Sequence, residues 1–393
     1  MIHNQNQIKL SNQKELFDIP EDITYLNIAS LSPSFKTVEQ AGLQGVLDKS
    51  KPYRITASDF FEPVSELKAL FAQLVDTNEP ERVVTIPSVS YGMATVANNI
   101  ILNKGDEIIV VDEQFPSNIY AWQKLVEKYD AKIITIHSPE LSQLNAETWN
   151  QEILNAINER TALVALGNIH WSNGSIFNLK SIREKTRAYN ALLVVDGSQT
   201  IGAFPFSINE IQPDALVCAG YKWLFGPYGC AYAYYGPYFD NGEPIENNWA
   251  NRMGSENLAG LTNYQHEYKP LANRYAVGES GNFISVKMQT VALKQVLEWS
   301  PEAIQDYCKS ISLDAANELE ALGCKIEHSD YRTHHLFGIK LPESLSMDSL
   351  KHELLSKNVF VSYRGDYLRL SCHLYNTSAD FEPIVDWIKR NNS

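Results

Sequence analysis

The chain has 393 residues, of which 44% are hydrophobic and 20% are charged, a balance typical of globular proteins with an ample core rather than of disordered ones. Its formal net charge of −14 argues against nucleic acid or an anionic membrane as partner, and no apolar run approaches the length of a membrane span. The polar N-terminus lacks a signal-peptide core and the five cysteines show neither a paired framework nor a metal-binding spacing, so we expect a cytoplasmic protein without a metal site.

The first hundred residues contain two segments of interest after a polar arm at residues 1–20. The segment T-Y-L-N-I-A-S-L-S-P (24–33) reads as a strand that ends at a proline. The segment V-V-T-I-P-S-V-S-Y-G-M-A (83–94) reads as strand, turn and helix. Small residues and free N–H groups at the start of that helix suit a phosphate, and the residues concerned are Ser88, Val89 and Ser90. A plain helix N-cap is the alternative reading of these serines.

Several short apolar runs then alternate with helical segments. We predict a strand and its exit loop within 107–119, and further strands at 132–136 and 162–166, joined by a helix around 146–158. The runs at 191–195 and 215–218 lack polar alternation. Such runs are typical of strands buried on both faces of a parallel sheet.

An acid and an amine follow the last two of these runs. Asp196 comes directly after the first run and Lys222 lies just past the second, and α/β sheets bind ligands at the carboxyl ends of their strands. This arrangement suggests pyridoxal phosphate (PLP), with Lys222 carrying the cofactor as a Schiff base and Asp196 against its pyridinium nitrogen. Gln199 can donate to the phenolate oxygen of the ring. The alternative is that Asp196 caps a helix and Lys222 is a solvated loop lysine.

The motifs around these residues resemble a known family. D-G-S-Q (196–199), A-G-Y-K (219–222) and G-P-Y-G (226–229) are similar to the pattern of class V aminotransferases, the cysteine-desulfurase-like branch of fold-type I PLP enzymes. The resemblance runs from about Tyr25 to about Ile384. It implies an α/β fold with a seven-stranded, mostly parallel sheet, and a homodimer whose sites use residues of both subunits. It divides the chain into an N-terminal arm (1–24), a large PLP-binding domain (25–285) and a small α+β domain (286–393).

The resemblance also assigns residues to the site. It implies cofactor contacts at Ser88, Val89, Ser90, Phe115, Asn173, Asp196, Gln199, Tyr221 and Lys222, and substrate contacts at Ala29, Ser30 and Arg369. Phe115 would stack on the ring, although a loop phenylalanine can also pack only on a neighbour. His170, in the same segment as Asn173, receives no catalytic role. Because Ala219 and Glu279 replace a serine and a threonine of the family, we predict that Ser280 or Asn282 reaches the phosphate of the other subunit.

Arg369 lies in a C-terminal segment, Y-R-G-D-Y-L-R-L-S-C-H-L-Y-N-T (363–377), that resembles the family's R-x-S-x-x-x-Y-N-T. A planar guanidinium reads a carboxylate through two parallel hydrogen bonds, so Arg369 is predicted to clamp the substrate α-carboxylate. A surface salt bridge is the other reading. Cys372 lies three residues on, which places it on the opposite face of a strand, so the nucleophilic cysteine of a desulfurase is not expected here.

The reaction predicted from these residues starts with proton removal from the α-carbon of an amino acid by Lys222. Transaminase-type chemistry is our first hypothesis. A PLP-dependent lyase (C–S or kynureninase-type β-elimination), an epimerase and, ranked below these, a cysteine desulfurase are the alternatives. A PLP-fold binding or regulatory protein that has lost turnover is the non-enzymatic alternative.

Overall fold

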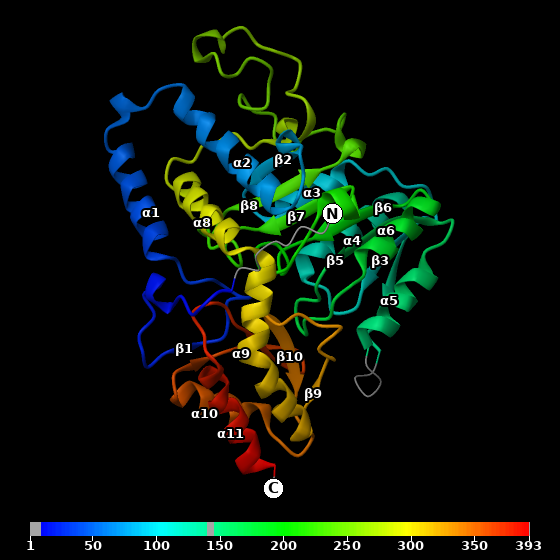
Figure 1. The fold of residues 1–393 in the computed structure, drawn as a ribbon. Helices are drawn as coiled ribbons and strands as arrows, with labels where there is room; N and C mark the ends of the chain where they lie inside the picture. The colour runs from blue at the N-terminus through cyan, green and yellow to red at the C-terminus, as the bar shows by residue number, and fades with distance from the viewer. Residues whose placement is uncertain (1–8, 140–144, 393) are drawn as a thin grey trace, which may run out of the picture.

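The computed structural model describes residues 9–139 and 145–392; residues 1–8 of the predicted arm lie outside this part. Its centre is a seven-stranded sheet with strand order β2-β8-β7-β6-β5-β3-β4 (Figure 1). Five consecutive strands of this order, from β7 to β4, run parallel to one another, whereas β8 is antiparallel to both β2 and β7. The predicted α/β fold with a seven-stranded, mostly parallel sheet is therefore confirmed.

The strands of this sheet lie close to the predicted runs. They are β2 (Val83–Ile86), β3 (Glu107–Val111), β4 (Lys132–Ile136), β5 (Thr161–Gly167), β6 (Leu192–Asp196), β7 (Ala215–Ala219) and β8 (Ala231–Tyr235). The remaining strands are β1 (Thr24–Tyr25), β9 (Lys325–Ile326), β10 (Leu336–Lys340), β11 (Val359–Phe360), β12 (Ser362–Arg364) and β13 (Tyr367–Ser371).

Helices cover the sheet and build the C-terminal part of the molecule (Figure 1). They are α1 (Lys36–Lys49), α2 (Glu62–Leu74), α3 (Val89–Asn98), α4 (Tyr120–Tyr129), α5 (Asn145–Ala156), α6 (Leu179–Ala188), α7 (Ile208–Ile211), α8 (Ser285–Trp299), α9 (Pro301–Ala321), α10 (Met347–Ser356) and α11 (Glu382–Asn391).

The central sheet is buried on both faces except at its edge strand β4, which is partly exposed, and the uninterrupted apolar runs of β6 and β7 predict this burial. Along β6 and β7, consecutive side chains enter two different cores: Val195 and Leu216 join one, and Val194 and Val217 join the other. The first core includes residues of α2, α5, α6 and α8, and the second includes residues of α3 and α4. Because side chains alternate across a strand, the two cores are the two faces of one sheet.

A second, four-stranded antiparallel sheet with order β12-β13-β10-β9 lies in the C-terminal part, beside the long helix α9 (Figure 1). Ser300 caps α9 by accepting a hydrogen bond from the backbone N–H of Ala303, with Pro301 at the first helical position. The N-terminal segment packs here too, since the N–H of Gln13 donates to the carbonyl of Leu374 (2.7 Å) and β1 pairs with β11. The division of the chain into domains at residues 24 and 285 stays a prediction.

Gly174 ties the loop after β5 to the second sheet. It has φ +81°, and a Cβ there would overlap the carbonyl oxygen of Leu336 on β10. Gly105 has φ +85° with open space around it, so it is a matched control. We expect Gly105→Ala to cost about 1 kcal/mol of unfolding free energy, the left-handed strain alone, and Gly174→Ala to cost roughly 3 kcal/mol because backbone must also move. Urea unfolding of both variants measures this, and equal losses would contradict the role of the contact.

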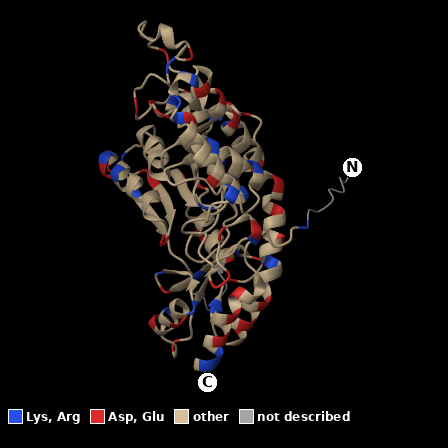
Figure 2. Ribbon diagram, turned by 90° about the vertical axis from the view of Figure 1, so that its left-hand side faces the viewer, with Lys and Arg blue, Asp and Glu red and all other residues tan. Residues whose placement is uncertain are grey.

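Charged residues of both signs are interspersed along the outer helices (Figure 2). Among the described residues, no helix combines the length and the apolar character that crossing a membrane requires.

Candidate active site

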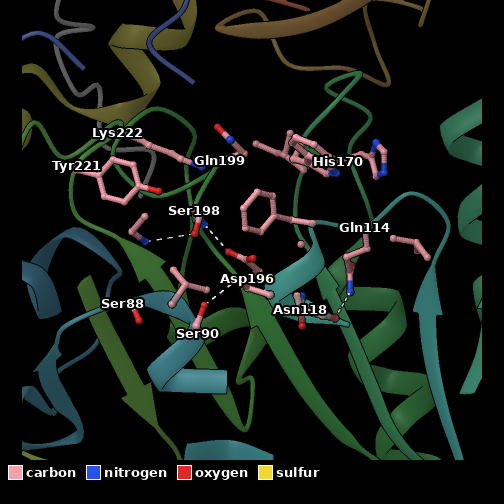
Figure 3. Close-up of a pocket in the computed structure, with 18 of the residues that line it drawn as sticks. Ser88, Ser90, Gln114, Asn118, His170, Asp196, Ser198, Gln199, Tyr221 and Lys222 are labelled. Atoms are coloured by element: carbon pink, nitrogen blue, oxygen red, sulfur yellow. Dashed lines mark hydrogen bonds between the residues drawn. The ribbon is translucent and has the colours of Figure 1, made fainter. Parts of the chain in front are cut away.

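The carboxyl ends of β6 and β7 form one wall of a cavity of about 200 Å³ (Figure 3). The two strands are parallel neighbours, with Asp196 opposite Val217, so the residues that follow each strand meet at the same edge. Asp196 and Lys222 both line this cavity. The structure therefore brings together the acid and the amine that the sequence singled out.

Lys222 is almost completely enclosed, with 9% of its surface exposed. The pKa of its amine is lowered from 10.5 to about 8, chiefly by burial; the negative charge of Asp196 raises this pKa, and the positive charges of Arg369 and Arg364 lower it. Its Nζ lies 5.7 Å from the centroid of the Phe115 ring. A sizeable fraction of this amine is therefore unprotonated near neutral pH, the state in which an amine is a nucleophile.

A hydrogen-bonded turn holds Asp196 in place. The backbone N–H of Ser198 donates to Asp196 Oδ1 (3.0 Å), and Ser198 Oγ accepts from the N–H of Ala219 (3.2 Å). This second bond links the turn after β6 to the end of β7. The carboxylate is thus used in a local turn and also faces the cavity, where it can meet a cationic ring nitrogen.

The N-terminus of α3 opens onto the same cavity at the serines labelled in Figure 3. Ser88 caps the helix, because its Oγ accepts from the N–H of Tyr91 (3.1 Å), and Ser90 Oγ donates to Ser117 Oγ (2.9 Å). Ser88 is therefore a helix cap that also lines the cavity, and its predicted contact with a phosphate stays a prediction. The N–H groups of Val89 and Ser90 have no acceptor within the helix, and such groups favour an anion.

Aromatic side chains also line the cavity. Phe115 is 39% exposed, and its ring meets that of Trp171 edge to face at 5.3 Å. Tyr221 lies against Tyr228, with ring centroids 4.5 Å apart. Phe115 therefore packs on a neighbour and also presents a flat side chain to the cavity, which suits stacking on a heterocycle.

The two amides predicted to contact the cofactor, Gln199 and Asn173, lie in different settings. Gln199 lines the cavity; its Nε2 donates to the carbonyl of Ala29 (3.1 Å) and its Oε1 accepts from Trp223 Nε1 (2.8 Å). The second N–H of its Nε2 remains for a ligand. The Oδ1 of Asn173 accepts from the N–H of Ser175 (3.0 Å), and this residue is not among those that line the cavity.

His170 is fully buried next to Asn173. Its Nε2 lies 3.1 Å from the carbonyl oxygen of Asp112, and its Nδ1 lies 3.0 Å from Ser172 Oγ. Burial lowers its pKa to about 4, so it is neutral at physiological pH. These contacts are those of a histidine with satisfied hydrogen bonds in the core.

Arg369 is 1% exposed and donates three hydrogen bonds: from Nε to Ser362 Oγ (2.9 Å), from Nη1 to the carbonyl of Trp171 (2.9 Å) and from Nη2 to Ser30 Oγ (2.7 Å). Burial lowers its pKa to about 9. No carboxylate oxygen within residues 9–139 and 145–392 lies within 4.0 Å of this guanidinium. A surface salt bridge is therefore not its role, and a buried cation without a counter-ion is suited to an anionic ligand.

Ser280 and Asn282 lie away from Lys222 within one chain. They border a separate cavity of about 500 Å³, which shares Pro87 and Gly229 with the first. Asn282 Oδ1 accepts from the N–H groups of Ile284 and Ser285 at the start of α8. Their predicted contact with a phosphate in the other subunit stays a prediction.

The structure adds lining residues that the sequence did not single out. They include Gln114, Ser117, Asn118, Trp171, Ser198 and Tyr228. Ser198 stands inside the D-G-S-Q motif, and Trp171 stands between His170 and Asn173, two residues named from the sequence. Arg364, which donates to Ser30 Oγ (3.2 Å), was also missed, because nothing in the sequence separates it from an ordinary surface arginine.

Comparisons with known proteins agree with this arrangement. The model of the family "Aminotransferase class-V" matches residues 54–382. An uncharacterized aminotransferase of Bacillus subtilis, YcbU, is 25% identical over 95% of this chain and 96% of its own. The fold is similar to an apo cysteine desulfurase from Thermococcus onnurineus (TM-score 0.82, 15% identity, 97% of this chain and 98% of that one). It is also similar to a lysine-to-alanine mutant of C-DES with glycine covalently linked to its PLP cofactor (TM-score 0.83, 17% identity, 96% and 99%). Because the family model spans most of the sequence, this chain belongs to the class V aminotransferase family.

Proposed function

We propose that this chain is a PLP-dependent enzyme that acts at the α-carbon of an amino acid, with transaminase-type chemistry as its first candidate reaction. The observation that carries the proposal is a buried Lys222 with a lowered pKa in one cavity with Asp196, beside a buried Arg369 that has no counter-ion among the described residues. Family membership and the PLP-linked relative support the same cofactor.

The residues present fit PLP at each of its functional groups. The aldehyde would meet Lys222, and the ring nitrogen would meet Asp196. The phosphate would meet the first turn of α3 at Val89 and Ser90, where N–H groups and the helix dipole favour negative charge. Phe115 would lie over the ring. The phosphate site would be completed by the Tyr221 hydroxyl and, in a homodimer, by Ser280 or Asn282 of the partner.

When bound, PLP supplies an electron sink for the bonds of the α-carbon. The chain supplies the rest. Asp196 holds a proton on the ring nitrogen by its charge, and Arg369 orients the substrate through its α-carboxylate, beside the backbone of Ala29 and the Oγ of Ser30. Lys222 would accept the α-proton and return it, a role that its lowered pKa favours near neutral pH. We propose a cytoplasmic location for this activity.

The proposal is tested by chemical trapping. After incubation with PLP, borohydride reduction and peptide mapping should label Lys222. The rate of labelling should rise with pH around a midpoint near the Lys222 pKa of about 8, because only the unprotonated amine attacks the aldehyde. A midpoint above 10 would show an ordinary lysine. Label on another lysine, or on none, would refute the cofactor assignment.

A panel of amino acids separates the possible reactions. A keto acid with pyridoxamine phosphate indicates a transaminase, pyruvate or alanine indicates a lyase, and inversion at the α-carbon indicates an epimerase. A persulfide would indicate a desulfurase. That reaction ranks last because the thiol of Cys372 is buried in the core, 3.5 Å from the carbonyl oxygen of His334.

A further inference from the structure

We propose that Arg364 binds a second carboxylate of the substrate, so that this enzyme selects amino acids with a carboxylate in addition to the one on the reacting α-carbon. The inference rests on the proposed function, because it takes Arg369 as the clamp for the α-carboxylate.

A tight hairpin fixes Arg364 relative to Arg369. Strands β12 and β13 pair antiparallel, with Ser362 opposite Arg369 and Arg364 opposite Tyr367. Directly opposed residues and residues two apart on one strand share a face, so both arginines lie on the same face of this hairpin. The connecting loop has two residues and begins with Gly365 at φ +53°, a conformation that favours glycine.

The two guanidiniums meet at the same two side chains. The Nη2 atoms of Arg364 and Arg369 both donate to Ser30 Oγ, at 3.2 Å and 2.7 Å. Their central carbons lie 5.4 Å and 5.7 Å from the centroid of the Trp171 ring, which lines the active-site cavity. In the described part of the chain, neither guanidinium has a carboxylate oxygen within 4.0 Å.

Counting donors separates the roles of the two arginines. A guanidinium has five N–H groups. Arg369 uses three of them on Ser362, Trp171 and Ser30, which leaves two, the number that one carboxylate takes in a bidentate contact. Arg364 uses two, on Ser30 and the carbonyl of Tyr363, and so keeps three. Neither arginine is among the residues that line the cavity, but both lie against Trp171, which does. One α-carboxylate bound by Arg369 therefore leaves Arg364 with unused donors at the same Trp171 ring.

The charges around the site agree with a doubly anionic ligand. Lys222, Arg364 and Arg369 interact with one another across the site, and Asp196 is the acid that opposes them at Lys222. Glu113 comes near the hairpin turn, with Oε1 3.9 Å from where a Cβ of Gly365 would stand, but it makes no ion pair with either arginine. A second carboxylate on the substrate offsets the repulsion among these three positive charges, because the acidic residues of the described chain form no ion pair with either arginine.

Binding of two simple acids of equal carbon number tests the inference. Calorimetric titration of the PLP-loaded protein with glutarate and with valerate compares a diacid with a monoacid. Arg364→Gln should weaken glutarate by about 10- to 100-fold, from the loss of hydrogen bonds between charged groups, and valerate by less than about threefold. Arg369→Gln should weaken both. Arg364→Lys should recover part of the loss, since it restores charge without the planar fork.

Lys325→Gln is the control variant, because it removes a positive charge from an exposed position on β9, at the opposite edge of the sheet that carries β12 and β13. It should leave both affinities unchanged. Equal weakening of glutarate and valerate in Arg364→Gln would overturn the inference, since Arg364 would then read the same carboxylate as Arg369. Because Arg364→Gln is compared on two ligands, a general loss of folding cannot produce the selective result.

A kinetic comparison identifies the source of the second carboxylate. A side-chain carboxylate is detected by comparing kcat/KM for L-glutamate with that for L-glutamine, and kcat/KM for L-aspartate with that for L-asparagine. L-cystine, in contrast, presents a second α-carboxylate. Arg364→Gln should collapse whichever ratio favours the diacid. If no diacid is preferred while Lys222 is still labelled by borohydride, this inference fails and the proposed function stands. If Lys222 is not labelled, the proposed function fails.

Discussion

Replacing Lys222 with alanine is expected to slow exchange of the substrate α-proton by about ten-thousand-fold or more, because the variant loses both the nucleophile and the base. Transamination, elimination and epimerisation all begin with removal of this proton. Exchange with deuterium from solvent, followed by NMR, therefore detects the first step without knowledge of the product. Binding of the cofactor itself should persist, since the contacts proposed for Asp196 and the start of α3 do not involve the amine.

Lys180→Ala is the matched control for this prediction, since the Lys180 side chain is 62% exposed, pairs with Glu210 and does not line the cavity. It should exchange the α-proton at the wild-type rate. If Lys222→Ala exchanged the α-proton of every tested amino acid as fast as the wild type, the amine would have no catalytic role. If neither protein exchanged any α-proton, the reading as a binding or regulatory protein that has lost turnover would be favoured.

The second large effect is expected at Arg369. Arg369→Gln should lower kcat/KM for every amino acid substrate, because the α-carboxylate loses a bidentate, charge-assisted contact in a buried site. Truncating one partner of a buried charge pair costs about 2–5 kcal/mol, which corresponds to roughly 30- to several-thousand-fold. Steady-state kinetics should show the loss chiefly as a higher KM, since the contact is present in the ground state.

Two variants separate binding from folding at this position. Arg369→Lys keeps the charge but not the fork, so we expect it to restore only part of the lost kcat/KM. Ser362→Ala removes one partner of Arg369 without removing the guanidinium, and should have a much smaller effect. A normal KM in Arg369→Gln together with a lowered unfolding free energy would mean that Arg369 is a structural residue and not a substrate clamp.

Much of the fold could be predicted because its signals are local. The strands β6 and β7 coincide within a residue with the predicted apolar runs, since uninterrupted runs of this length suit a sheet that is covered on both faces. The start of α9 at Ser300 and Pro301 was predictable from capping preferences alone. Asp196 and Lys222 follow parallel neighbouring strands, so their meeting at one cavity followed from topology.

Other parts of the site were not open to such reasoning. Asn173 lies in the loop that follows the predicted strand at 162–166, and the resemblance implies a cofactor contact for it. In the structure, however, the Oδ1 of Asn173 accepts from the N–H of Ser175, and Asn173 does not line the cavity. Gln199 lines it, but two of its hydrogen-bonding groups are already used by Ala29 and Trp223. A motif gives the position of a side chain along the chain. It does not give the competing partners that orient that side chain.

The sequence by itself determined the class of fold, the acid and amine that define the site, and the family to which they belong, because hydrophobic runs and short motifs are properties of neighbouring residues. Only the tertiary structure decided that Arg369 is a buried cation with no counter-ion in the described chain, and that Arg364 joins it at Ser30. These arginines lie more than 330 residues from Ser30 along the chain. Burial and pairing of charge depend on what the folded chain places around each group, and no local pattern encodes that.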